Sequence, residues 1–151
     1  MRIGFIFPSS EYLFDPFRGD PHTHFQLLTV LEDYFGDAAD LALIDLRGIK
    51  KEFAQYHIPE CDVYLHSVYT LDYNEQLSII SSLKQRYPDA KHIAGGPHVV
   101  AFQEESLKIF DSIIKGITNI LDIRNFISTT VRVPGLQKAE CNPAKENCSF
   151  E

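Results

Sequence analysis

Short apolar runs alternate with amphipathic stretches along most of the chain. Five runs are expected to form strands, at residues 3–7, 41–46, 62–68, 91–94 and 112–115. The stretches between them carry apolar residues at helical spacing, most clearly at residues 22–35, which Gly36 ends, and at 74–87. Such alternation predicts parallel strands, right-handed crossovers and helices on both faces of a sheet. We therefore expect a three-layer α/β fold of the flavodoxin-like Rossmann type, with a five-stranded parallel sheet in the order 2-1-3-4-5.

Weaker helical patterns and an irregular end complete the chain. Further helices are expected at residues 50–56, 102–110 and 117–127. Beyond residue 130, proline and polar residues dominate and no periodicity persists. The sequence thus predicts one domain at residues 1–130 and an irregular tail or linker at residues 131–151.

Composition excludes several kinds of partner. The chain has 14 basic and 21 acidic residues, a net charge of -7, and no basic run longer than Lys50-Lys51, so nucleic acid is not an expected partner. No apolar run approaches the roughly 18 residues of a membrane span, and the apolar start is too short for a signal peptide. We expect a cytoplasmic protein that does not contact a membrane. The odd, scattered set of Cys61, Cys141 and Cys148 argues against a disulfide framework.

The loops that follow the strands are expected to meet at one edge of the sheet. They are residues 8–21, 67–73, 95–98 and 116–119. In open α/β sheets, ligands bind beyond the carboxyl ends of the strands. Gly95 and Gly96 offer backbone without side chains there, which suits close approach of a ligand, although a glycine pair by itself is more often a simple turn.

Three familiar functions of this fold suit these loops poorly. The G-x-G-x-x-G spacing that binds a pyrophosphate is missing, which disfavours a dinucleotide. A flavin mononucleotide needs a hydroxyl-rich loop directly after the first strand, whereas residues 8–10 lead into an aromatic, acidic segment. Phosphotransfer in the manner of a receiver domain needs an acidic pair after strand one and an aspartate after strand three, and residues 8–9 and 67–68 supply neither.

Residues 62–105 form the most distinctive string, DVYLHSVYTLDYNEQLSIISSLKQRYPDAKHIAGGPHVVAFQEE. This string resembles the cobalamin-binding domain at the amino end of many radical S-adenosylmethionine enzymes. The features shared in order are Ser67, Thr70, Pro-Asp-Ala-Lys at 88–91, Gly-Gly-Pro-His at 95–98 and Glu104-Glu105. The resemblance extends from Met1 to about Gly116 and implies a flavodoxin-like domain that binds cobalamin, with methylcobalamin as one form.

The resemblance also implies roles for particular residues. Gly95 and Gly96 would form a slot without side chains for the nucleotide tail of the cofactor, and Ser67 or Thr70 would donate a hydroxyl to it. The implied cofactor-binding residues are Ser67, Tyr69, Thr70, Gly95, Gly96, Pro97, His98 and Gly116. The corrin ring would lie on the rim of the site, where His98 is a candidate donor. Aromatic residues that would cover the ring, if they do not simply pack in the core or the loops, are Tyr12, Phe14, Phe17 and Tyr69.

Departures from the family narrow the expected function. The chain lacks the C-x-x-x-C-x-x-C motif that holds an iron–sulfur cluster, so we expect no iron–sulfur cluster and no catalytic residues in it. Gly116 is followed by Ile117-Thr118-Asn119, where the family usually has Gly-Glu-Gly-Glu. The implied function is to present the corrinoid to a radical S-adenosylmethionine domain or subunit, for methyl transfer. The alternatives are a cofactor-free docking or regulatory module that acts through protein contacts and, less favoured, a flavin carrier.

The lower ligand of cobalt is a separate question. In cobalamin-dependent methyltransferases and mutases an Asp-x-His-x-x-Gly loop supplies it, and here Asp20-Pro21-His22 reproduces Asp-x-His while Phe25 stands in place of glycine. His22 is therefore the candidate metal ligand. A structural interpretation is favoured over it, with His22 in the first turn of a helix that Asp20 caps.

The other histidines and the cysteines receive structural interpretations. His57, His66 and His92 are interpreted as ordinary surface or strand residues, and Cys61 as buried packing. Cys141 and Cys148 amount to half a zinc site and are interpreted as incidental thiols.

Overall fold

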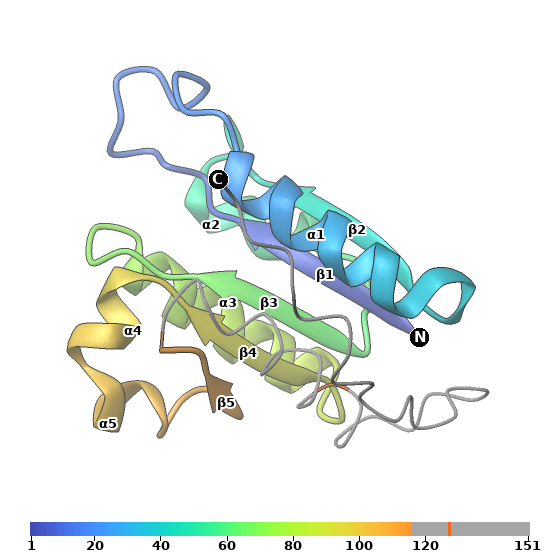
Figure 1. Ribbon diagram of the computed structural model, residues 1–151. Helices are drawn as coiled ribbons and strands as arrows, with labels where there is room; N and C mark the ends of the chain where they lie inside the picture. The colour runs from blue at the N-terminus through green and yellow to red at the C-terminus, as the bar shows by residue number, and fades with distance from the viewer. Residues whose placement is uncertain (116–126, 128–151) are drawn as a thin grey trace, which may run out of the picture.

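One parallel sheet organises the molecule. The computed structural model describes residues 1–115 and 127 of the 151-residue chain. Five parallel strands lie in the order β2-β1-β3-β4-β5 (Figure 1), which confirms the expected α/β fold of the flavodoxin-like type. The strands are β1 Arg2–Phe7, β2 Asp40–Asp45, β3 Val63–Ser67, β4 Lys91–Gly95 and β5 Ser112–Ile113.

Helices connect the strands. They are α1 His22–Phe35, α2 Lys51–Ala54, α3 Tyr73–Arg86, α4 Pro97–Ala101 and α5 Gln103–Ser106, with 3-10 turns η1 Gly36–Ala38 and η2 Gln55–His57. The bounds of α1 agree with the prediction. It ends where Gly36 takes a φ of 48°, and the Gly36 N–H is donated to the carbonyl of Glu32.

The expected helix at residues 102–110 is wrong in its bounds. Two short helices replace it, α4 before Phe102 and α5 after it. The first begins directly after Gly96 because Pro97 occupies its first turn, where proline needs no hydrogen-bond partner for its nitrogen. The chain then bends at Phe102, whose φ and ψ are -124° and 57°.

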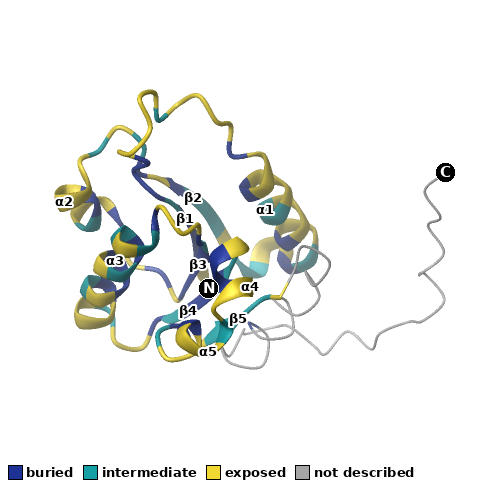
Figure 2. Cartoon of the chain, turned by 90° about the vertical axis from the view of Figure 1, so that its left-hand side faces the viewer, coloured by how far each residue is buried: buried dark blue, intermediate teal, exposed yellow. Residues whose placement is uncertain are grey.

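The two faces of the sheet carry different helices. α1 covers one face, and α2 and α3 cover the other (Figures 1 and 2). On the α1 face, strand residues such as Phe5 and Leu65 pack with Leu31 of α1. On the opposite face, Ile6 packs with Ile79 of α3. Burial on both faces is what the continuous apolar runs of the central strands predicted.

Some of the sequence predictions concern residues that the structure does not describe. These are Gly116, the expected helix at 117–127 apart from Ile127, and the tail at 131–151. Ile127 is fully buried within the apolar cluster on the α1 face. Within residues 1–115 and 127, no helix has the length and apolar character needed to cross a membrane.

Residues 8–21 form a long loop between β1 and α1 (Figure 1). At its start, the backbone N–H and hydroxyl of Ser9 donate to the two carboxylate oxygens of Glu75, over 2.7 and 2.8 Å. Near its end, the guanidinium of Arg47 donates to the carbonyl of Gly19 over 2.8 Å and lies over the ring of Phe17. The side chain of Phe14 between these attachments is fully exposed.

Candidate functional site

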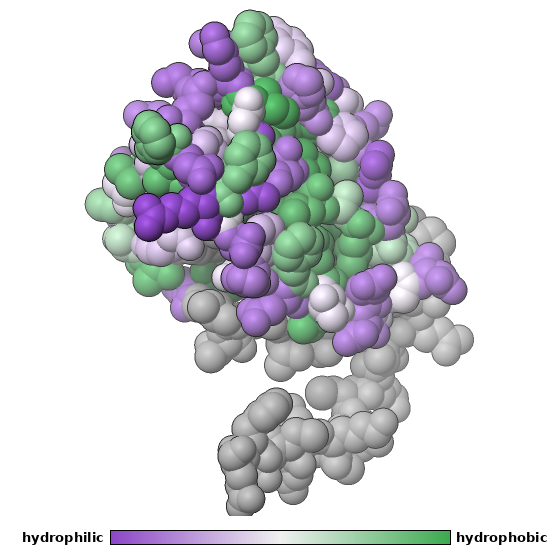
Figure 3. Space-filling view, turned by 90° about the horizontal axis from the view of Figure 1, so that it is seen from above, coloured by the Kyte–Doolittle hydropathy of each residue, from purple (hydrophilic) through white to green (hydrophobic). Residues whose placement is uncertain are grey.

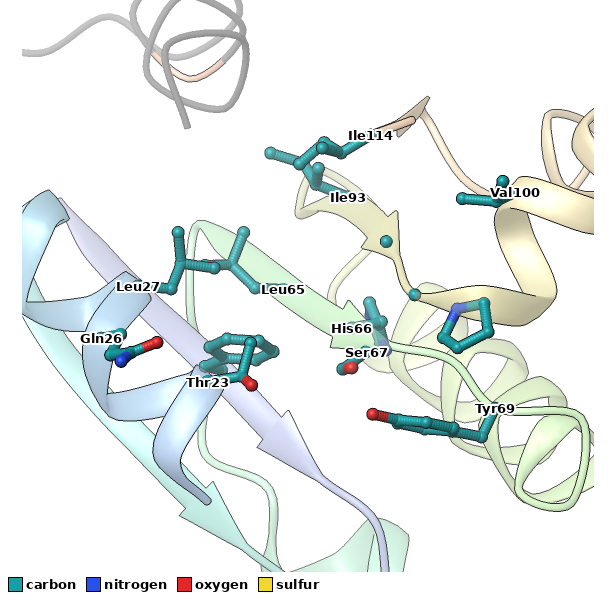
Figure 4. Close-up of a pocket in the computed structure, with 14 residues that line it drawn as sticks. Thr23, Gln26, Leu27, Leu65, His66, Ser67, Tyr69, Ile93, Val100 and Ile114 are labelled. Carbon is teal, nitrogen blue, oxygen red and sulfur yellow. The ribbon is translucent and has the colours of Figure 1, made fainter. Parts of the chain in front are cut away.

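A cavity of about 340 Å³ lies at the carboxyl edge of the sheet, on the α1 face. Strands β1, β3 and β4 form its floor, and α1 and the segment after β4 form its walls (Figure 4). The lining residues are Phe5, Thr23, Gln26, Leu27, Leu65, His66, Ser67, Tyr69, Ile93, Gly95, Gly96, Pro97, Val100 and Ile114. The loops that follow β3 and β4 therefore share one site, as the sequence predicted, but no residue of the loop at 8–21 lines it, and residues 116–119 lie outside the described residues.

Gly95 leaves open space in this cavity. It is the register partner of Ser67 on the neighbouring strand, and both positions lie on the α1 face with Leu65 and Ile93. A Cβ added at Gly95 would meet nothing closer than the Cβ of Ile114, at 3.8 Å. A Cβ at this position would therefore fit at ordinary contact distances, with the Cβ and the carbonyl oxygen of Ile114 as its nearest described neighbours.

At Gly96, the backbone conformation and the close approach of Val68 both require glycine. Its φ is 102°, and a Cβ there would lie 2.7 Å from the carbonyl oxygen and 2.8 Å from the nitrogen of Val68. Around it, the Val68 N–H donates to the carbonyl of Gly95, and the His98 N–H donates to the carbonyl of Val68. Gly96 thus lets the loop after β3 pack against the turn after β4, and the protein's own backbone fills the space that a side chain would need.

The predicted binding residues fall into two groups. Those that line the cavity are Ser67, Tyr69, Gly95, Gly96 and Pro97. Thr70 and His98 instead contact each other, with 3.2 Å between Thr70 Oγ1 and His98 Nδ1, and neither is a lining residue. The ring of His98 is buried and stacks on that of Tyr73 at 4.0 Å between centroids. Gly116 lies outside the described residues.

His22 is exposed at the beginning of α1. Its side chain is 82% exposed, and its Nε2 lies 3.7 Å from a carboxylate oxygen of Asp20. The expected helix cap by Asp20 is wrong: Pro21 occupies the N-cap position, and no side chain makes a capping hydrogen bond. The next residue, Thr23, does line the cavity.

Exposed aromatic side chains surround the carboxyl edge. Tyr12, Phe17 and Tyr69 are each about half exposed, and Phe14 is fully exposed. The ring of Tyr69 extends from the loop after β3 toward the α1 side of the cavity (Figure 4). In the view from above, a band of hydrophobic surface runs between hydrophilic residues (Figure 3). A flat apolar ligand could lie against such a surface.

An acidic pair holds the long loop on the other side of this edge. Burial, and then the nearby Glu75 carboxylate, raise the pKa of Asp72 to about 6. Burial, and then the nearby Asp72 carboxylate, raise the pKa of Tyr12, while Glu75 accepts from Ser9. These contacts join residues 9–12 to the beginning of α3, so the loop that carries the exposed aromatics has a defined base.

The sequence did not reveal a buried polar chain on the opposite face of the sheet. His66 Nδ1 lies 2.9 Å from Gln76 Oε1, and His66 Nε2 lies 3.1 Å from His92 Nδ1. With the Gln76 oxygen as acceptor, each imidazole donates from its Nδ1. Burial lowers the pKa of His66 to about 3 and that of His92 to about 4, so both rings are neutral at pH 7. The interpretation of His66 and His92 as ordinary surface or strand residues did not include this pairing. The His66 ring makes these contacts on the α3 side, away from the cavity.

The wall residues Thr23 and Gln26 were also missed. Both are exposed residues in the first turns of α1 and face the cavity mouth. Their spacing of three places them on one side of the helix, but only the position of α1 on the sheet shows which side that is.

Metal ligands are not grouped in the described part of the chain. Among residues 1–115 and 127, no cluster of three or more histidine, cysteine, aspartate or glutamate side chains could hold a metal ion. Cys61 is buried packing, as predicted, and burial raises the pKa of its thiol to about 11. Cys141 and Cys148 lie outside the described residues.

Comparison with family models gives no match to this chain, and none of the curated proteins is significantly similar to it. The assignment of a function therefore depends on the site and on the resemblance read from residues 62–105.

Proposed function

We propose that this chain binds a cobalamin, with the nucleotide tail of the cofactor in the cavity and the corrin ring on the rim. The observation that carries the proposal lies at the carboxyl ends of β3 and β4, where Gly95 borders the cavity. There, a strand end without a side chain lies in register with the hydroxyl of Ser67, at the edge where open α/β sheets bind ligands. The resemblance implied Gly95 and Gly96 for the tail slot, with Ser67 or Thr70 as donor; of these, Gly95 and Ser67 support the proposal, because the Val68 backbone occupies the space beside Gly96 and Thr70 does not line the cavity.

The size of the cavity suits the tail alone. Small-molecule sites usually measure about 300–1,000 Å³, and this cavity of about 340 Å³ lies at the lower limit. One base and its sugar fit such a volume, whereas a whole corrin ring does not. Tyr69, which lines the cavity and is half exposed, provides apolar surface beside the mouth, where the ring would lie.

The partner and the reaction follow from the resemblance alone. Bound cobalamin would supply a cobalt centre that carries a methyl group. This chain would hold the corrinoid and present it to a radical S-adenosylmethionine domain or subunit, which would provide the iron–sulfur chemistry for methyl transfer.

His22 is the candidate of this chain for the lower cobalt ligand. Its exposed imidazole has only the Asp20 carboxylate as a neighbour at ion-pair distance among the described residues. Nitrogen hyperfine coupling in the electron paramagnetic resonance spectrum of the cobalt(II) form, lost in His22→Ala, would support this role. A spectrum without that coupling in the wild-type protein would exclude it.

Retention of a corrinoid tests the proposal. The purified chain is mixed with hydroxocobalamin and desalted, and the corrin absorbance of the protein fraction is measured. Gly95→Leu adds a side chain that fills the cavity, so it should reduce retention at least about tenfold, a loss of about 1.4 kcal/mol in binding free energy. Ser81→Leu adds the same side chain at an exposed position of α3, on the opposite face, and should retain as much as wild type.

Circular dichroism melts of both variants show whether the fold is intact. Wild-type protein that retains no corrinoid, or a folded Gly95→Leu variant that retains the wild-type amount, would contradict the proposal.

A docking or regulatory module without a cofactor is the second candidate. The fully exposed ring of Phe14, at the tip of a loop that is held at both ends, favours contact with another protein. A chain that is colourless after reconstitution, and whose melting temperature does not change with added corrinoid, would favour this function.

A further inference from the structure

The side chains that line the cavity are apolar at its floor and include polar groups at its mouth. The floor residues Phe5, Leu65 and Ile93 are between 1% and 4% exposed, and all three are apolar. The side chains with hydrogen-bonding groups lie at the mouth, where Thr23, Gln26 and Tyr69 are exposed and Ser67 is partly buried. Leu27 of α1 and Ile114, both partly buried, add apolar walls above the floor.

The backbone of the floor residues Phe5, Leu65 and Ile93 is paired with neighbouring strands on both sides. β3 pairs with β1 on one side and with β4 on the other, and β4 pairs in turn with β5 through Ile93 and Ala94. At the upper end of β4, the carbonyl of Gly95 accepts from the Val68 N–H. The amides and carbonyls of these three floor positions are therefore used within the sheet.

We propose that this cavity selects corrinoids by their lower base, accepting a benzimidazole and discriminating against a purine. The inference rests on the proposed function, since it concerns the same site. A benzimidazole that enters the floor presents carbon and methyl groups to the apolar side chains. Adenine presents an exocyclic amino group and additional ring nitrogens at the same depth, and these lose their hydrogen bonds to water without a replacement.

The polar side chains that border the cavity lie away from the floor residues Phe5, Leu65 and Ile93. Ser67 is the last residue of β3, two positions beyond Leu65 toward the mouth. The His66 ring is engaged with Gln76 and His92 on the other face of the sheet. Gln26 is exposed on α1 at the mouth of the cavity. A buried polar group that goes unpaired usually weakens binding by about 5- to 150-fold.

Affinity for three corrinoids tests the inference in the wild-type chain. Dissociation constants are measured by equilibrium dialysis for cobalamin, for its adenine analogue, and for cobinamide, which has no nucleotide. Each constant is corrected for the fraction of free corrinoid whose base has left cobalt, which the absorption spectrum gives. Cobalamin should then bind at least about tenfold more tightly than either of the others.

The outcomes separate this inference from the proposed function. Equal corrected affinities for cobalamin and the adenine analogue, or tighter binding of the analogue, would overturn the selectivity and leave cobalamin binding in place. Cobinamide that binds as tightly as cobalamin would show that the base is not in the cavity. Absence of binding by all three would overturn the proposed function and the inference together.

A variant pair locates the selectivity in the cavity. Leu27→Asn places an amide on the partly buried wall and should shift the ratio of the two affinities at least about fivefold toward the adenine analogue. Val30→Asn makes the same kind of change on the exposed side of α1, outside the lining, and should leave the ratio unchanged. The cost of releasing the base from cobalt cancels between protein variants. An unchanged ratio in folded Leu27→Asn would overturn the placement of the base beside this wall.

Discussion

Replacing Gly96 by alanine should destabilise the fold much more than the same change at Gly95. The φ and ψ of Gly96 are 102° and 172°, a conformation that costs a residue with a Cβ about 1–3 kcal/mol. The new Cβ would also lie 2.7 Å from the carbonyl oxygen of Val68. Because that atom belongs to the backbone, the loop after β3 must move, which adds about 1–3 kcal/mol. We expect a total loss of about 2–6 kcal/mol in the free energy of unfolding.

Gly95→Ala is the matched control. Its Cβ would meet Ile114 at an ordinary contact distance of 3.8 Å, and its φ is not positive. Glycine within a strand is less stable than alanine by roughly 0.5–1 kcal/mol, so this variant should equal the wild type or exceed it by up to about 1 kcal/mol.

Urea denaturation, followed by far-ultraviolet circular dichroism because the chain has no tryptophan, measures both changes. With an m-value of about 2 kcal/mol/M, the Gly96→Ala midpoint should fall by about 1–3 M. A Gly96→Ala midpoint equal to that of Gly95→Ala would refute the reasoning, since the two glycines would then serve the same purpose.

Three further changes test other contacts. Burial lowers the pKa of His24 to about 4, from 6.5 in the unfolded chain, so the unfolded chain binds the proton first and stability falls as the pH drops from about 7 to 4. His24→Leu should therefore make the urea midpoint fall less steeply over this pH range. A pH profile equal to that of the wild type would count against this role of His24. The pKa of Asp72 is raised from 3.8 to about 6, so stability is lost as the pH rises through 6. Asp72→Asn should therefore raise the melting temperature at pH 8 relative to pH 4, whereas the same change at both pH values would argue for a different cause. Arg47→Ala releases the end of the long loop and should speed chymotrypsin cleavage near Phe14 several-fold, while Arg18→Ala serves as the control; equal rates in the two variants would disprove the attachment.

Sequence periodicity was sufficient for the framework of this protein. The parallel sheet followed from strict alternation, its strand order from the flavodoxin-like arrangement expected for it, and the bounds of α1 from its apolar stripe and from Gly36. The location of Ser67 and Gly95 at one edge followed from the rule that carboxyl ends of parallel strands lie together. These features depend on local pattern and topology, both of which a sequence contains.

Contacts between distant segments could not be predicted from the sequence. Gly95 and Gly96 look equivalent as a pair, and only the position of the Val68 backbone separates an open space from a filled one. The pairing of His66 with His92 depends on strand register, which a single sequence does not specify to the residue.

The buried imidazole pair has a consequence for how the strands are aligned. Apolar side chains on a sheet would tolerate a slide of one strand by two residues, because the same face would still point inward. The chain from Gln76 through His66 to His92 would not, since its hydrogen bonds are directional and cross from α3 over two strands. The mutual position of Ser67 and Gly95 is thus held from behind the sheet, by hydrogen bonds made on the α3 side.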